Sequence, residues 1–188
     1  MITTTNGTIN QTFFWGQCQY TFKALIQGLS GVGKTQLFNR YLNDDFDGLS
    51  YKPTTKAQFG AKFVNHGGRQ VQVQVWDCAG AEYFYMQNSM IKNADAFIMV
   101  FDITNRESFN KIKTLYLENY MISGKMRARE QVNIIVGAKT DLNDNRVVSY
   151  EEARELAYEL NASYVEVSSA INTNMNAVFD NIMETLIP

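Results

Sequence analysis

The run GLSGVGKT at Gly28–Thr35 has the residue types and spacing of a phosphate-binding loop. Its glycines tolerate backbone angles that other residues avoid, so successive N–H groups can converge on phosphate oxygens. Lys34 adds a cation, and the run follows an apolar segment and precedes a helical one, as this motif requires. The alternative is a glycine-rich turn without a ligand, which leaves the lysine and the threonine unexplained.

The hydroxyl group of Thr35 is the candidate metal ligand of this loop. Hard oxygen donors suit Mg²⁺, and a hydroxyl directly after the lysine is placed to hold an ion that bridges the outer phosphates. The sequence therefore predicts a combined phosphate and magnesium site at the start of a helix.

Strand-like and helix-like segments alternate along the chain from Tyr20 onward. The apolar segment Phe22–Gln27 predicts a strand before the loop, and Lys34–Asn43 predicts a helix with one apolar face. Continuous apolar runs at Ala96–Asp102 and Val132–Ala138 are typical of central parallel strands covered on both faces. This alternation predicts a doubly wound α/β fold in which ligands bind beyond the carboxyl ends of the strands.

Several local patterns indicate where other elements begin and turn. Gln58–Val64 and Val71–Asp77 flank the turn signal NHGG at residues 65–68, which predicts an antiparallel hairpin. Thr104 and Ser149 each stand three residues before a glutamate, the spacing of a capping box at a helix start. The last helix should pack on the core through an apolar stripe of Met175, Val178, Phe179, Ile182, Met183 and Leu186.

Five further segments resemble the motifs of small GTPases of the Ras superfamily, and most closely those of Rab proteins. WDCAG at Trp76–Gly80 is similar to the family's W-D-T-A-G run, and FDITNRESF at Phe101–Phe109 is similar to the corresponding Rab segment. YKPTTKAQF at Tyr51–Phe59 resembles a Rab first switch. Gly137–Leu142 resembles the guanine motif, and Tyr164–Ala170 resembles the final nucleotide loop.

The resemblance covers roughly residues 20–187 and implies one Rab-like G domain over residues 20–188. Its fold would be a six-stranded, mostly parallel sheet with one antiparallel strand, flanked by about five helices. The implied ligands are GTP or GDP and Mg²⁺, with Thr35, Thr54 and, through water, Asp77 at the metal. The implied nucleotide-binding residues are Ser30, Gly31, Val32, Gly33, Lys34, Thr35, Gln36, Phe46, Tyr51, Thr54, Gly80, Lys139, Asp141, Ser168 and Ser169.

Asp141 is the residue that the resemblance implies for base selection. A carboxylate accepts two hydrogen bonds from the N1–H and exocyclic amine of guanine, and the matching edge of adenine lacks both donors. By the same resemblance, Lys139 would pack along the base plane, Phe46 would stack near it, and the Ser169 N–H would meet guanine O6. The Gly80 N–H would contact the γ-phosphate, as would Thr54.

Three positions depart from the family pattern. Ala81 stands where a glutamine normally orients the attacking water, so we expect slow or absent hydrolysis. Ala138 stands where an asparagine normally bonds the base and the phosphate loop, and Ala170 replaces a lysine beside the base. Each lost buried hydrogen bond costs on the order of 1 kcal/mol, so nucleotide affinity should fall ~10-fold to ~100-fold.

Three functions remain open from the sequence. The first is a guanine-nucleotide switch in vesicle trafficking, with effector and regulator proteins meeting aromatics such as Phe59, Trp76 and Phe84. The second is a pseudo-GTPase interaction module, one G domain of a larger protein, that binds nucleotide without turnover. The third is an ATP-using enzyme with the same loop. Asp141 argues against this reading, because its carboxylate suits guanine and not adenine.

Composition restricts the partners and the compartment. The 188 residues carry a formal net charge of -2, which does not favour nucleic acid or an anionic membrane as a general partner. Cys18 and Cys78 lie far apart and outside any metal-ligand spacing, which predicts a reducing compartment. No apolar run approaches the ~20 residues of a membrane span. No prenylation cysteines precede Pro188, so either the natural chain continues past this residue or it lacks that membrane anchor. We expect a cytoplasmic protein, peripheral to endomembranes, that meets membranes only indirectly.

Residues 1–19 are polar and lack charged side chains, which predicts a flexible N-terminal extension. The aromatic cluster Phe13–Trp15 leaves a second possibility open, because three adjacent aromatics are costly to expose to water. This cluster would then dock on the domain or on a partner.

Overall fold

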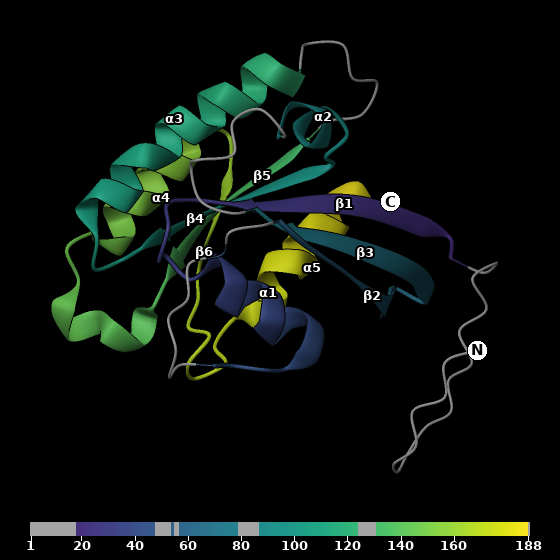
Figure 1. Cartoon of the computed structure of the whole chain (residues 1–188), viewed down its shortest axis with the longest axis horizontal. Helices are drawn as coiled ribbons and strands as arrows, with labels where there is room; N and C mark the ends of the chain where they lie inside the picture. Colours follow the sequence, from purple (N-terminus) through teal and green to yellow (C-terminus); the bar gives the residue numbers. More distant parts are fainter. Residues whose placement is uncertain (1–17, 48–53, 55–56, 79–86, 124–130, 188) are drawn as a thin grey trace.

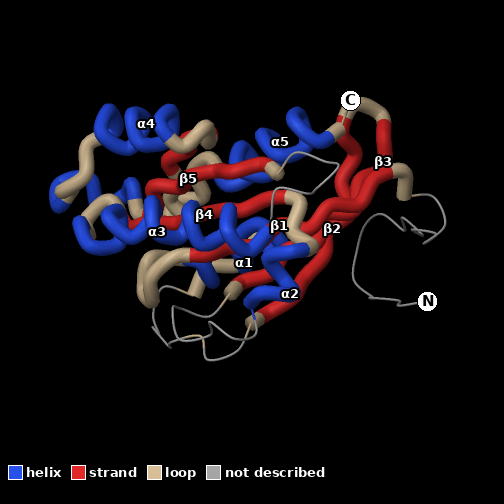
Figure 2. The backbone as a smooth tube through the Cα atoms, turned by 90° about the horizontal axis from the view of Figure 1, so that it is seen from above, coloured by secondary structure: helices blue, strands red, loops and turns tan. Residues whose placement is uncertain are grey.

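The computed structural model describes residues 18–47, 54, 57–78, 87–123 and 131–187. In this part of the chain, a six-stranded sheet in the order β2-β3-β1-β4-β5-β6 carries helices on both faces (Figures 1 and 2). The strands are β1 (Tyr20–Gln27), β2 (Gln58–His66), β3 (Arg69–Asp77), β4 (Ala96–Asp102), β5 (Val132–Ala138) and β6 (Ser163–Glu166). The helices are α1 (Lys34–Asn43), α2 (Gln87–Lys92), α3 (Arg106–Ser123), α4 (Tyr150–Glu159), α5 (Met175–Leu186) and the 3₁₀ helix η1 (Thr140–Asn145).

The direction of the strands confirms the α/β fold that the sequence predicts. Strands β3, β1, β4, β5 and β6 run parallel, and only β2 pairs antiparallel, with β3. Parallel strands end at the same edge of a sheet. Asp77, Asp102, Ala138 and Glu166 are the last residues of four of these strands, so all four reach that edge together.

Apolar layers hold the helices on the two faces of the sheet. Helices α1 and α5 lie side by side on one face, and α2, α3 and α4 lie on the other (Figure 1). Each of the six stripe residues predicted on α5 is buried. The ring of Tyr41 on α1 stacks on Phe179 of α5 with 3.5 Å between ring centroids, so the two helices share one core.

The hairpin between β2 and β3 is antiparallel, as predicted, with a tighter turn than the pattern suggested. Both strands extend toward the turn, which leaves only Gly67 and Gly68 between them. These two glycines have φ angles of 57° and 79°, a region that favours glycine and that matches the twist of paired strands. The side chain of Asn65 accepts the N–H of Gly68 at 3.0 Å.

One of the two predicted helix caps is confirmed and the other is wrong. Ser149 caps α4, since its side chain accepts the backbone N–H of Glu152. The cap of α3 is Asn105 and not Thr104, because the Asn105 side-chain oxygen accepts the N–H of Ser108. The Thr104 hydroxyl instead donates to the Asp102 carboxylate at 2.7 Å and is unavailable to the helix.

The first described residues of the chain are tied to the sheet. Gln19 donates its N–H to the Gln70 carbonyl at 3.0 Å, which ties it to the sheet, and β1 begins at Tyr20 rather than Phe22. The aromatic cluster at residues 13–15 lies outside the described residues. Cys18 and Cys78 are both free thiols. No helix in the described ranges is long and apolar enough to cross a membrane.

Candidate functional site

The predicted phosphate loop connects β1 to α1 and requires glycine at specific positions. Gly28, Gly31 and Gly33 have φ angles of 150°, 80° and 107°, which side-chain-bearing residues rarely adopt. A Cβ atom on Gly28 would lie 2.2 Å from the carbonyl oxygen of Val100, so the strand β4 backbone leaves no room for one. The loop opens at the amino end of α1, where unpaired N–H groups and the helix dipole favour an anion.

Lys34 is held across this loop. Its ammonium donates to the carbonyls of Gly28 and Leu29 at 3.0 and 2.7 Å, and the residue is only 5% exposed. Burial lowers the pKa of Lys34 from its ordinary value, and the negative charge of nearby Asp77 opposes that shift. An anion in the loop would stabilise the charged ammonium, so the arrangement suits a phosphate ligand.

Three oxygen-bearing side chains predicted at the metal converge beside the lysine. The Thr35 hydroxyl lies 2.7 Å from the hydroxyl of Thr54 and donates to Asp77 Oδ2 at 2.5 Å. Asp77 is fully buried, and its other oxygen, Oδ1, has no hydrogen-bond partner. Burial raises the pKa of this carboxyl, opposed by the hydrogen bond from Thr35 and by the charge of Lys34. A buried carboxylate oxygen without a donor, next to two hydroxyls, fits a hard divalent cation such as Mg²⁺.

We call Gly28–Thr35, Thr54 and Asp77 the phosphate half of the site. Among its predicted ligands, Val32 is buried in the core and Ser30 is exposed at the loop. Gln36 donates its side-chain N–H to the Asp47 carbonyl at 2.8 Å. Tyr51, Gly80 and Ala81 lie outside the described residues.

The remaining predicted site residues form what we call the base half: Phe46, Lys139, Asp141, Ser168 and Ser169. Asp141 lies on η1, and its Oδ1 accepts the hydroxyl of Ser168 at 2.5 Å. Ser168 is fully buried and also accepts the N–H of Ile171, so the two loops of this half are joined at one hydroxyl. The structure therefore brings two of the predicted base-binding residues, Asp141 and Ser168, into direct contact.

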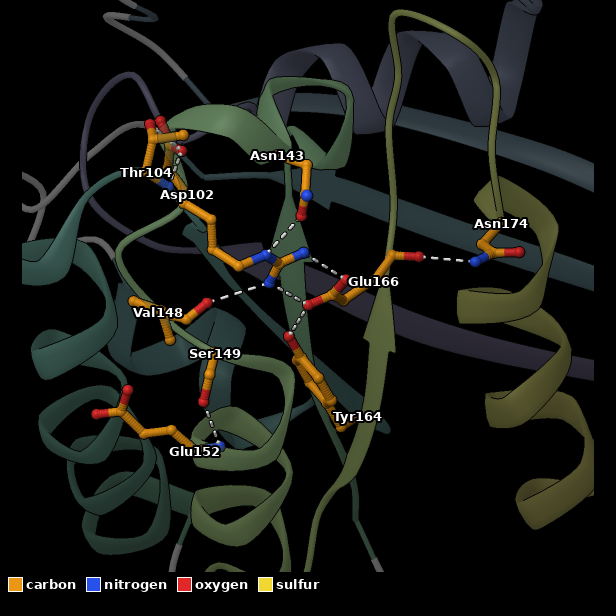
Figure 3. Close-up of polar contacts among 10 residues, drawn as sticks. Asp102, Thr104, Asn143, Val148, Ser149, Glu152, Tyr164, Glu166 and Asn174 are labelled. Carbon is orange, nitrogen blue, oxygen red and sulfur yellow. Dashed lines mark hydrogen bonds and ion pairs between the residues drawn. The ribbon is translucent and has the colours of Figure 1, made fainter.

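Lys139 occupies an unusual backbone conformation at the end of β5. Its φ angle is 66°, which is uncommon for a lysine, and its ammonium pairs with Asp102 Oδ2 at 2.6 Å. Asp102 is buried at the end of β4 and also accepts the N–H and the hydroxyl of Thr104 (Figure 3). The ion pair therefore anchors the Lys139 ammonium at the end of β4.

A second ion pair, between Arg146 and Glu166, stabilises the loops of the base half. The sequence alone did not indicate it. Arg146 follows η1 and makes a two-pronged pair with Glu166 at 2.7 and 2.9 Å. Glu166 also accepts the hydroxyl of Tyr164, and its carbonyl accepts the side-chain N–H of Asn174 (Figure 3). Glu166 thus connects the loop that carries Asp141 to the loop that carries Ser168.

Phe46 also has a partner that the sequence did not indicate. The guanidinium of Arg40 lies over the Phe46 ring, 5.5 Å from its centroid, and the Arg40 Nε donates to the Ser169 carbonyl at 2.9 Å. The two contacts join the aromatic residue to the loop after β6. No local pattern links residues this distant in sequence.

Ala138, the last residue of β5, separates the two halves. It is buried, and a Cβ atom added to Gly33 would lie 3.7 Å from the Ala138 Cβ. This position is therefore next to the phosphate loop, where a polar side chain could bond to both halves. The methyl group of alanine offers neither a donor nor an acceptor.

Comparisons with known proteins agree with this geometry. The model of the Ras family matches residues 23–187. The chain is 37% identical to Ras-related protein Rab-3 of Caenorhabditis elegans over 175 residues, which is 89% of this chain and 74% of that protein. It is 38% identical to Ras-related protein RIC1 of Oryza sativa subsp. japonica over 162 residues, covering 85% of this chain and 77% of that protein. It is 35% identical to GTP-binding protein ypt1 of Schizosaccharomyces pombe, again over 85% and 77% of the two chains.

The fold, the loop between β1 and α1 and these similarities lead to one assignment. The chain belongs to the Ras family of small GTPases and is Rab-like.

Proposed function

We propose that this protein binds GDP and GTP with Mg²⁺ and acts as a Rab-like switch in vesicle trafficking, with slow or absent intrinsic hydrolysis. The observation that carries the proposal is the convergence of Thr35, Thr54 and Asp77 at the open end of the glycine loop. The buried Asp77 Oδ1 without a donor supports a cation ligand at that point. The name of the relative ypt1 describes that protein as GTP-binding, which supports the same ligand class.

The phosphate half would hold the outer phosphates through backbone N–H groups and the Lys34 ammonium. The Thr35 and Thr54 hydroxyls, with Asp77 through water, would hold Mg²⁺. When bound, that ion neutralises charge on the outer phosphates.

Selection of guanine would rest on Asp141. Its Oδ1 already accepts the Ser168 hydroxyl, which fixes the orientation of the carboxylate, while the residue remains exposed to a ligand. A carboxylate in this orientation accepts from the two donors on the guanine edge, and adenine offers neither. The anchored Lys139 would cover one side of the base.

The switch proposal concerns the segments around Thr54 and Gly80. A contact between the Thr54 hydroxyl and the γ-phosphate would make the conformation of its segment depend on the nucleotide. Effector and regulator proteins would read this change beside the tilted pair Phe59 and Trp76, whose ring centroids lie 4.7 Å apart. Phe59 is 53% exposed, so an apolar surface is available to a partner. The protein would act in the cytoplasm, peripheral to endomembranes.

The nucleotide assignment is tested by purifying the protein without added nucleotide and identifying what co-purifies by chromatography. The affinities for GDP, GTP and ATP are then measured by calorimetry with and without Mg²⁺. Guanine nucleotides should bind more tightly than ATP, and removal of Mg²⁺ should weaken binding. Tighter binding of ATP would overturn the proposal.

Slow hydrolysis rests on Ala81, which has no group to orient an attacking water. Single-turnover hydrolysis of GTP is measured for the wild type and for Ala81→Gln, with Tyr158→Phe, an exposed change on α4, as a control. The glutamine variant should be faster. A wild-type rate equal to that of ordinary Rab proteins, with no response to Ala81→Gln, would contradict impaired catalysis.

A second candidate function is a pseudo-GTPase interaction module that binds nucleotide without turnover. The buried Ala138, adjacent to Gly33, favours it because the two halves lack a polar link at that point. This candidate predicts no hydrolysis in either the wild type or Ala81→Gln, together with partner binding that is insensitive to the bound nucleotide. A partner that prefers the GTP-loaded form would exclude it.

A further inference from the structure

Arg40 occupies a central position beside the base half although it belongs to α1. Its side chain is only 15% exposed. Its Nε donates to the Ser169 carbonyl at 2.9 Å, and one terminal nitrogen donates to the Asp44 carbonyl at 3.0 Å. The same guanidinium lies over the ring of Phe46. One cation therefore contacts the loop after β6, the end of α1 and the aromatic residue of the base half.

A second contact runs parallel to the first. Asn172 donates its side-chain N–H to Asp44 Oδ1 at 3.1 Å, and the Asp44 carboxylate also faces Arg40. Asp44 and Asn172 both have φ angles of 55°, in the left-handed region, which side-chain-bearing residues adopt infrequently and which aspartate and asparagine tolerate best. Such conformations persist where surrounding contacts over-determine them. The bonds from Arg40 and Asn172 supply those contacts.

Two positions beside these loops carry no polar side chain in this sequence. Ala138 and Ala170 carry methyl groups at the two positions that flank the base loops. The pair of Arg146 with Glu166 is a separate contact, which connects η1 with β6. Two hydrogen bonds therefore tie the Ser169 loop to the end of α1, one from Arg40 to the Ser169 carbonyl and one from Asn172 to Asp44.

We propose that Arg40 is a positioning residue for the guanine base, which holds Phe46 and the Ser169 loop in the geometry that binds the base. The inference rests on the proposed guanine-nucleotide function. A hydrogen bond from a charged donor is stronger than a neutral one, and the cation adds to it by its contact with the aromatic face. Loss of Arg40 removes both of these contacts at once, and among the described residues no hydrogen bond or ion pair joins the Arg40 side chain to the phosphate half.

The test compares GDP with ADP, because ADP lacks the guanine edge and relies on the phosphate half. Dissociation constants for both nucleotides with Mg²⁺ are measured for the wild type, Arg40→Ala, Arg40→Lys and the control Arg106→Ala, whose pair with Glu152 is exposed. Arg40→Ala should weaken GDP binding ~10-fold or more, from the loss of charge-assisted contacts, and leave ADP binding unchanged. Arg40→Lys keeps the positive charge but loses the planar set of N–H donors of the guanidinium, so its loss of GDP affinity should be intermediate. Arg106→Ala should change neither value.

A double-mutant cycle with Ala138→Asn measures the coupling between the two positions in GDP affinity. A general loss of stability would not change this coupling. If Arg40 supplies support that Ala138 lacks, the effect of Arg40→Ala on GDP should be smaller in the Ala138→Asn background. Equal loss of GDP and ADP affinity, or an unchanged GDP to ADP ratio in both Arg40 variants, would overturn the positioning role. Absence of GDP binding by the wild-type protein would overturn the proposed function instead.

Discussion

The phosphate half and the base half of the site are built in different ways. The phosphate half forms where β1 passes directly into α1, and its functional side chains Lys34 and Asp77 are buried. The base half is assembled from loops after β5 and β6, and Asp141 is exposed. A half made from element ends within the core is held by the fold itself, whereas a half made from loops needs dedicated side-chain braces.

Backbone conformation shows the same contrast. The unusual φ angles of the phosphate half all fall on glycines, which adopt them at little cost. Around the base half they fall on Lys139, Asn172 and Asn174, and this region is uncommon for lysine although asparagine tolerates it. The pairs Arg146 with Glu166 and Lys139 with Asp102 hold these loops in place. The base half should therefore respond to changes at residues that never touch the ligand.

Lys34→Ala should have the largest effect, because it removes the only buried cation seen in the described parts of the phosphate half. Loss of a buried, hydrogen-bonded charge costs about 2–5 kcal/mol, so GDP affinity should fall at least ~30-fold. Calorimetric titration with GDP measures the change. Lys113→Ala, which removes an exposed pair with Glu159, is the control and should bind GDP normally. Near-wild-type affinity in Lys34→Ala would contradict a phosphate role for this loop.

Glu166→Gln should destabilise the base half, because it removes the charge that pairs with Arg146. The forked pair with Arg146 is largely covered, with 18% of the Glu166 side chain exposed, so the cost in unfolding free energy should be ~1–3 kcal/mol. Urea unfolding of the nucleotide-free protein measures it. Glu159→Gln breaks an exposed pair with Lys113, at 58% exposure of the glutamate side chain, and should cost less than ~1 kcal/mol. Equal effects of the two variants would show that the Glu166 contacts contribute no more than a surface pair.

Ala138→Asn should tighten nucleotide binding, because its amide can form the polar link between the two halves that alanine cannot. One regained hydrogen bond contributes ~1 kcal/mol, so release of a fluorescent GDP analogue should slow ~5-fold to ~10-fold. The position is buried next to Gly33, and stability is measured alongside to detect overpacking. Unchanged release from a stably folded variant would indicate that the halves are already linked elsewhere.

Ser149→Ala should have the smallest effect and should leave both halves intact. The serine caps α4, and loss of such a cap costs ~1 kcal/mol, or about 2–4 °C in melting temperature for a chain of this size. Ser149→Thr keeps the capping oxygen and should restore most of the loss. GDP affinity should not change in either variant, and a large decrease would connect α4 to the site in a way that the contacts do not suggest.

The sequence predicted those parts of the molecule that rest on contiguous patterns. The bounds of α1, β4 and β5 follow from apolar runs and periodicity, and the loop at Gly28–Thr35 is one unbroken motif. Thr104 was wrong as a cap because its hydroxyl had a better acceptor in Asp102, which local spacing cannot reveal. Arg40 was missed for the same reason, since its partner Ser169 lies 129 residues away. Long-range side-chain contacts leave no mark on local periodicity.

The central claim is that the phosphate half supplies binding and the base half supplies the preference for guanine. It is tested most directly by measuring GDP and ADP dissociation constants, with Mg²⁺, for the wild type and Asp141→Ala side by side. Within the described residues, the Asp141 side chain is hydrogen-bonded to Ser168 and to no residue of the phosphate half. The wild type should bind GDP more tightly than ADP, and Asp141→Ala should remove that preference while ADP affinity persists. ADP binding at least as tight as GDP binding in the wild type, or an equal loss of both in the variant, would contradict the account.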